Sequence, residues 1–70
     1  MKVLVMKDEH LNSVEYESQL NLHDLTSLMG YLKANDLISE YKILDYTVEE
    51  LNGERNEEQY NKEKDYLKNV

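Results

Sequence analysis

Two histidines and a few closely spaced carboxylates are the residues of this chain that could take part in chemistry. His10 follows Asp8 and Glu9, a set that could hold a metal ion weakly, although a solvated turn is the ordinary interpretation. His23 stands beside Asp24, where both are expected on the surface of a first helical turn. The sequence has neither a Gly-x-Ser-x-Gly elbow nor a glycine-rich phosphate loop. We therefore predict no catalytic, metal or cofactor site and no enzyme.

Glu15 and Glu17 resemble a pair of carboxylates for general acid–base catalysis. In a strand, however, this spacing places both side chains on one face. The surrounding sequence predicts no apolar cleft that would shift their pKa. Two interpretations stay open: a solvated strand face, or carboxylates that stand in for phosphates before a basic partner.

The acidic residues are concentrated in one part of the chain. Fifteen Asp and Glu stand against eight Lys and Arg, a net charge of −7. Most of the excess falls in one stretch, whose acidic residues and single basic residue are Asp45, Glu49, Glu50, Glu54, Glu57, Glu58 and Arg55. A field of this sign repels nucleic-acid backbones and attracts basic clefts. The charge therefore disfavours direct nucleic-acid binding and favours a basic protein partner.

The length of 70 residues predicts one small domain. Such a chain buries only roughly 60% of its unfolded surface, and its core supplies about 3–5 kcal/mol. Without cysteine, disulfides and thiolate metal sites are excluded as further sources of stability. Oligomerisation, most simply as a homodimer, is therefore expected to add the stability that the small core lacks. The absence of cysteine suits a reducing cytoplasm. The N-terminal apolar run of four residues is too short for a signal peptide or a membrane span.

Periodicity predicts a small α+β domain with the order β-β-α-β-α. Residues 2–7 are apolar on both faces, whereas residues 13–19 alternate between apolar and acidic. Residues 40–48 are rich enough in β-branched and aromatic side chains for a third strand. A right-handed crossover from the second strand to the third gives a three-stranded sheet of order 2-1-3. The first strand is then central, which explains its two apolar faces.

Two helices complete the prediction. Residues 22–32 carry an apolar stripe, with Asn21 as N-cap, Asp24 in capping-box position and Asn35 available for a left-handed residue after the helix. This helix and the strands form a compact domain over residues 1–50. Residues 51–70 predict an acidic, solvated C-terminal helix that frays when alone. The main helix covers one face of the sheet, so the other face and two strand edges are left for partners.

All large aromatic residues are tyrosines: Tyr16, Tyr31, Tyr41, Tyr46, Tyr60 and Tyr66. Tyrosine buries apolar area, keeps a hydroxyl for a partner and is common at interface hot spots. Tyr16 and either Tyr41 or Tyr46 are expected in the core. Tyr31, Tyr46 and Tyr60 are candidate anchors for a protein partner.

The run Val14-Glu15-Tyr16-Glu17, followed by residues 20–25 and Leu28, resembles the small dimeric uracil-DNA glycosylase inhibitors of phages. The similarity covers residues 3–48 in pattern and residues 14–28 closely. It implies a homodimer that mimics DNA, with carboxylates in place of phosphates and a hydrophobic pocket that grips an enzyme loop. That family has a Phe near the position of Leu25, where it helps to form the pocket, and the tail after Glu49 has no counterpart in it.

The leading hypothesis is a small acidic inhibitor, encoded by a phage or mobile element, that blocks the basic nucleic-acid site of a host enzyme or defence complex. The residues expected to bind the partner are Glu15, Glu17, Asp45, Glu49, Glu50, Glu54, Glu57, Glu58, Tyr31, Tyr46 and Tyr60. The alternative is a homo-oligomeric structural or adaptor domain whose acidic surface serves solubility only.

Overall fold

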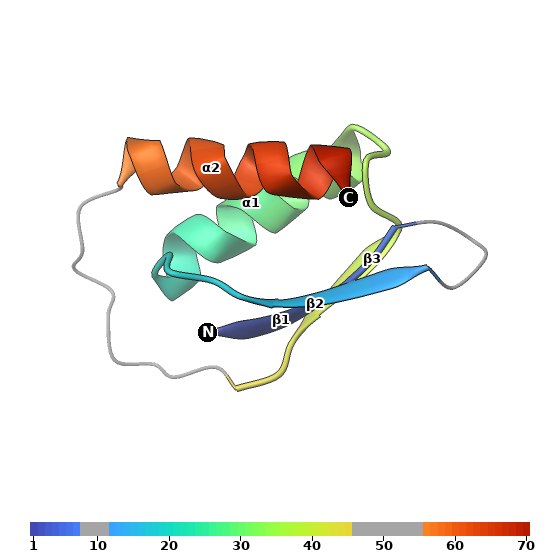
Figure 1. The fold of residues 1–70 in the computed structure, drawn as a ribbon, viewed down its shortest axis with the longest axis horizontal. Helices are drawn as coiled ribbons and strands as arrows, with labels where there is room; N and C mark the ends of the chain where they lie inside the picture. Colours follow the sequence, from blue (N-terminus) through green and yellow to red (C-terminus); the bar gives the residue numbers. More distant parts are fainter. Residues whose placement is uncertain (8–11, 46–55) are drawn as a thin grey trace.

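The computed structural model describes residues 1–7, 12–45 and 56–70 (Figure 1). The elements are β1 (Lys2–Met6), β2 (Ser13–Glu17), α1 (Leu22–Ala34), β3 (Glu40–Ile43) and α2 (Glu57–Asn69). The strands form one antiparallel sheet in the order β2-β1-β3. This confirms the predicted α+β class, element order and central position of β1.

Both helices lie on the same side of the sheet (Figure 1). On β1, Val3 and Val5 point to this side and are fully buried, while Leu4 and Met6 point to the other side and stay half-buried. The apolar residues on both faces of β1 therefore reflect its central position between two strands. They do not require a covering layer on each face.

The hydrophobic core lies between the sheet and the helices. Its buried members are Val3, Val5, Leu20, Leu25, Leu28, Met29, Leu32, Ile38 and Leu67. Four of the nine come from the stripe of α1, because residues three or four apart share a helix face. A fifth, Leu67, comes from α2, so the C-terminal helix packs into the same core as β1 and α1.

Each helix begins at an asparagine cap. Asn21 Oδ1 accepts a hydrogen bond from the backbone N–H of Asp24 at 2.8 Å, as the sequence predicts. Asn56 Oδ1 accepts from the N–H of Gln59 at 3.1 Å. These bonds satisfy amide groups that the first turn of a helix leaves without a partner.

The left-handed residue after α1 is Asp36, with φ of 59°, and not Asn35 as predicted. Asn35 is the C-cap, with φ of −100°. The Asp36 N–H donates to the carbonyl of Lys33 at 3.2 Å, and the Leu37 N–H donates to that of Leu32 at 2.9 Å. These two hydrogen bonds form a Schellman-type ending, in which the residue after the C-cap adopts the left-handed conformation. That residue is Asp36, and Asp tolerates this conformation.

β3 ends at Ile43, earlier than the predicted end at Val48. Among the described strands β3 pairs with β1 alone, and β1 begins at Lys2. The Leu44 N–H still donates to the Lys2 carbonyl at 2.8 Å, but the Lys2 N–H donates to the side chain of Asp45 at 2.5 Å. Within the described residues the backbone ladder therefore stops at this end, and residues 46–48 lie outside the described ranges.

Candidate protein-binding surface

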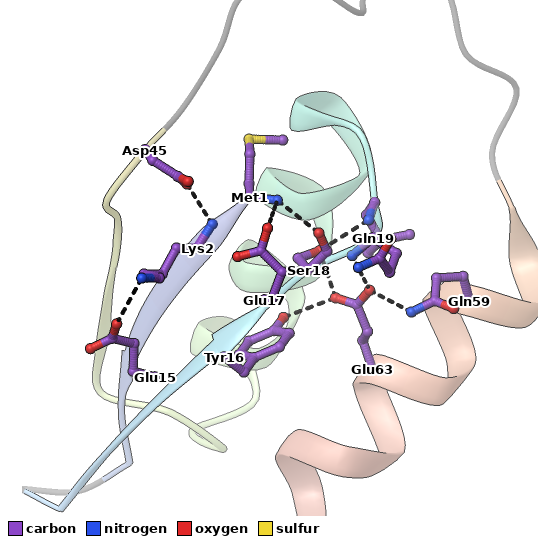
Figure 2. A network of polar contacts seen from close by, with 11 residues as sticks. Met1, Lys2, Glu15, Tyr16, Glu17, Ser18, Gln19, Asp45, Gln59 and Glu63 are labelled. Carbon is purple, nitrogen blue, oxygen red and sulfur yellow. Dashed lines mark hydrogen bonds and ion pairs between the residues drawn. The ribbon is translucent and has the colours of Figure 1, made fainter.

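Glu63 is a buried carboxylate that ties α2 to the end of β2, and only 5% of it is exposed. Its Oε1 accepts hydrogen bonds from the Tyr16 hydroxyl at 3.0 Å and the Ser18 hydroxyl at 2.7 Å. Its Oε2 accepts from the Gln19 N–H at 3.0 Å and the Gln59 side-chain amide at 2.8 Å (Figure 2). Four donors thus saturate both oxygens, which offsets the cost of burying them.

Among the partners of Glu63, Tyr16 has a hydroxyl with a shifted pKa. Burial and the nearby charge of Glu63 raise the pKa of the Tyr16 hydroxyl far above its usual range, so the phenol stays protonated and donates. Its ring also contacts that of Tyr66, with centroids 5.7 Å apart. Because both Glu63 oxygens accept from donors of the protein itself, the cluster joins α2 to the end of β2.

Sequence reasoning missed Glu63, although a signal existed. Glu63 lies three residues after Tyr60 and four before Leu67, so it interrupts the thin apolar stripe of the C-terminal helix. A carboxylate within such a stripe indicates a buried polar contact. Its partners Tyr16, Ser18 and Gln19, on β2 and directly after it, could not be foreseen, because they are more than forty residues away in the sequence.

The face of the sheet turned away from the helices is called the open face here. Its residues are Lys2, Leu4, Met6, Ser13, Glu15, Glu17, Glu40 and Lys42. Across the three strands, Leu4 lies between Glu15 on β2 and Lys42 on β3. The open face therefore has an apolar centre between charged edges.

The predicted carboxylates of β2 stand on this open face and are paired with neighbouring cations. Lys2 Nζ lies 3.7 Å from a Glu15 oxygen, and both side chains are about half-exposed. The N-terminal ammonium of Met1 lies 3.4 Å from a Glu17 oxygen (Figure 2). An exposed ion pair such as Lys2–Glu15 contributes about 0–1 kcal/mol, so a cation of a partner can compete for Glu15. Glu17 is itself 58% exposed, although the side chain of Met1 beside it is only 10% exposed.

The other predicted residues lie elsewhere. Asp45 is beside the start of β1, and Glu57 and Glu58 are exposed in the first turn of α2. Tyr31 of α1 is 41% exposed and Tyr60 of α2 is half-buried. Glu49, Glu50, Glu54 and Tyr46 lie outside the described residues.

Tyr31 and Tyr60 both lie near the side chain of Lys64. The ammonium of Lys64 lies 5.6 Å from the ring centroid of Tyr31 and 5.9 Å from that of Tyr60, within the range of cation–π attraction. Both tyrosines belong to the helical layer, whereas Glu15 and Glu17 belong to the open face. The predicted site is therefore divided between two sides of the domain.

The charge of the described surface is nearly balanced. The described ranges hold seven Lys and ten Asp or Glu, a side-chain charge of −3 out of the total of −7. Two of these ten, Asp24 and Glu63, are buried. The remaining excess of −4 belongs by sequence to residues 8–11 and 46–55.

A groove of about 700 Å³ runs between α1 and the edge strand β3. It is lined by Leu22, His23, Thr26, Lys33, Glu40, Tyr41, Lys42 and Ile43. Glu40 Oε1 accepts a hydrogen bond from the Tyr41 N–H at 3.1 Å, and Lys33 Nζ lies 3.2 Å from both Glu40 oxygens. The Tyr41 N–H and then Lys33 hold the pKa of Glu40 below its usual value.

Comparisons with protein-family models, curated proteins and solved structures found no match for this chain. Within the part of the chain that the structure describes, no helix is long and apolar enough to cross a membrane. In the same residues, no group of three or more His, Cys, Asp or Glu could hold a metal ion. His10, with Asp8 and Glu9, lies outside these ranges.

Proposed function

We propose that this protein is a non-enzymatic binding module that occupies a basic surface of a partner protein. The observation that carries the proposal is the open face, which neither helix covers (Figure 1). On it, half-buried Leu4 lies between Glu15 and Lys42, and half-buried Met6 lies between Ser13 and Glu40. An apolar centre with a polar rim is the usual composition of a protein interface. Three carboxylates of this rim (Glu15, Glu17 and Glu40) outnumber its two lysines (Lys2 and Lys42) and fit a partner rich in Lys and Arg.

The partner in this proposal is a nucleic-acid-handling enzyme or defence complex, and the module acts as an inhibitor of phage or mobile-element type. Such partners carry deep basic clefts that bind phosphates. Glu15, Glu17 and Asp45 would contact the cleft in place of phosphate groups. The net charge of −7 would speed association and make it sensitive to salt.

The second candidate is a homo-oligomeric adaptor domain, and one observation favours it. The described surface carries nearly equal numbers of positive and negative side chains, so this part of the molecule does not present a uniformly acidic face. In that case, the remaining acidic residues serve solubility. The two functions differ in their response to competing DNA, because only a phosphate mimic shares its binding site with DNA.

The test is a pull-down from bacterial lysate on the immobilised protein, eluted in parallel with salt and with duplex DNA. The proposal expects DNA to release a nucleic-acid-handling protein. The variant E15Q/E17Q should retain less of it, whereas D36N/D65N, which changes the net charge equally at exposed positions away from the open face, should retain as much as the unmodified protein. If DNA releases nothing, or if both variants lose the partner equally, the open face is not a phosphate-mimicking site and the adaptor function takes its place.

A further inference from the structure

The two edges of the sheet differ in what covers them. The β2 edge lies beside α2, which is tied to it through Tyr16, Ser18 and Glu63. The β3 edge borders the open groove along α1. Among the described residues, no second strand pairs with β3 besides β1, and the backbone groups of such an edge can pair with another strand. The β3 edge is therefore the better place for an added strand.

The ladder between β1 and β3 shows which residues of β3 face outward. The Leu44 N–H donates to the carbonyl of Lys2. Because hydrogen-bonded positions alternate in an antiparallel ladder, the backbone groups of Leu44, Lys42 and Glu40 point towards β1. The backbone groups of Tyr41 and Ile43 then point away from β1, outward from the edge of the sheet. At this edge, the carboxylate of Glu40 accepts a hydrogen bond from the Tyr41 N–H.

We propose that a second copy of this chain pairs antiparallel with β3, with Tyr41 opposite Tyr41 of the second copy, to form a continuous six-stranded sheet. In this register, Glu40 stands opposite Lys42 of the second copy, and Lys42 stands opposite its Glu40. The twofold symmetry produces both pairs at once. Opposite charges directly across antiparallel strands stabilise a pairing, so the sequence of β3 is complementary to itself.

The charge pattern also selects this register over its neighbour. A shift by one pair along the outward-facing residues places Tyr41 opposite Ile43 of the second copy. Lys42 would then stand directly opposite Lys42 of that copy, and like charges in this position are destabilising. The β3 sequence therefore favours the register centred on Tyr41.

The groove gives the second copy an apolar surface to cover. Tyr41, Ile43 and Leu22 line it and are only half-buried in the single chain. In the paired sheet, the tyrosine rings of the two copies lie side by side at the twofold axis, on the side of the helices. Cross-strand aromatic pairs add to such a contact.

Pairing must displace an existing contact of Glu40. Its carboxylate turns from the Tyr41 N–H and Lys33 towards Lys42 of the second copy. Both side chains of the Lys33–Glu40 pair are about half-exposed, so its loss costs little. A contact of one short strand is small, and we expect a dimer that dissociates on dilution.

This inference stands independently of the proposed function, because a dimer forms or fails to form whether or not a basic partner exists. It differs from a dimer made by the open face, which would bury Leu4 and Met6. Edge pairing instead leaves the open faces of both copies exposed and continuous. A partner-binding surface on the open face would thus be doubled.

The experiment is sedimentation equilibrium on the 70-residue chain over a range of concentrations. The unmodified protein should show a monomer–dimer equilibrium. E40K places lysines opposite each other in both pairs, and K42E places glutamates opposite each other, so each should weaken the dimer at least about tenfold. An equimolar mixture of E40K and K42E should associate again as a heterodimer, since both of its cross-strand pairs are attractive.

The matched controls are D65K and K62E, which make the same charge changes at exposed positions of α2 and should leave the dimer unchanged. Circular dichroism of every variant checks the fold. Hydrogen exchange adds a readout that an open-face dimer would not give, because the Ile43 amide should become protected as concentration rises. A protein that stays monomeric, a mixture that fails to associate, or a dimer without protection at Ile43 would each overturn the proposal.

Discussion

The two helices lie on the same face of one sheet and have the same length of 13 residues, yet they are held by different forces. α1 contributes four apolar side chains to the core, whereas α2 contributes Leu67 alone. α2 adds Glu63, whose two oxygens accept four hydrogen bonds. The difference shows that a helix with few apolar residues can still be positioned when one buried polar group is fully paired.

The two forces differ in direction and in tolerance. Hydrophobic burial is roughly proportional to area and does not depend on orientation, so α1 can adjust to small changes in its contacts. The Glu63 cluster has fixed donors and acceptors, so it specifies one rotation and one height of α2 on β2. If one donor or the acceptor is removed, the remaining groups are left buried without partners.

The largest expected effect comes from the apolar side of this comparison. Leu28 of α1 is fully buried, and Leu28→Ala removes its packing and leaves a cavity. We expect the free energy of unfolding to fall by about 2–5 kcal/mol, measured by urea denaturation. Ser27→Ala, at an exposed position of the same helix, should change it by less than about 0.5 kcal/mol. A loss of similar size in both variants would contradict the assigned face of α1.

The sequence predicted α1 and the sheet because their signals are local. The Asn21 cap and the apolar spacing of residues 25, 28, 29 and 32 are visible within one helix, and the structure confirms both. The alternation in residues 13–17 places Glu15 and Glu17 on the exposed face of β2. The order β2-β1-β3 followed from a rule of chain connection that needs no side-chain detail.

What could not be predicted depends on contacts between distant segments. The end of β3 is set by where β1 begins, and the role of Glu63 is set by Tyr16 and Ser18. The candidate site was grouped by charge and residue type, which carry no information on the side of the sheet. Tyr31 and Tyr60 therefore appeared together with Glu15, although the structure places them in the helical layer.

The second effect, smaller than the first, tests the polar side of the comparison. Glu63→Gln replaces one acceptor oxygen by an NH₂ group that faces donors, so two groups lose their partner. We expect a loss of roughly 1.5–3 kcal/mol in the free energy of unfolding. Hydrogen exchange should show amides of α2 opening before those of α1.

The matched control for this change is Asp65→Asn, an equal loss of charge at an exposed position of the same helix. It should leave both stability and exchange nearly unchanged. If Asp65→Asn loosens α2 as much as Glu63→Gln does, then net charge and not the buried cluster holds this helix.

The smallest expected effect is a loss of stability at alkaline pH that depends on Tyr16. The pKa of its hydroxyl is raised in the folded protein, so the contribution is fully present below the unfolded value near 10 and is lost as pH rises above it. We expect less than about 1 kcal/mol per pH unit, because solvent screens the part of the ring that it reaches. Urea denaturation between pH 8 and 11 measures this slope.

Tyr16→Phe separates Tyr16 from the other groups that titrate in this range. The variant loses the hydroxyl that donates to Glu63, so it should be less stable at pH 8 but should decline less steeply towards pH 11. Tyr31→Phe, which removes a hydroxyl from an exposed ring, should keep the slope of the unmodified protein. Equal slopes in all three proteins would mean that Tyr16 ionises as freely as an exposed phenol. The link between β2 and α2 would then depend on the Ser18, Gln19 and Gln59 donors alone.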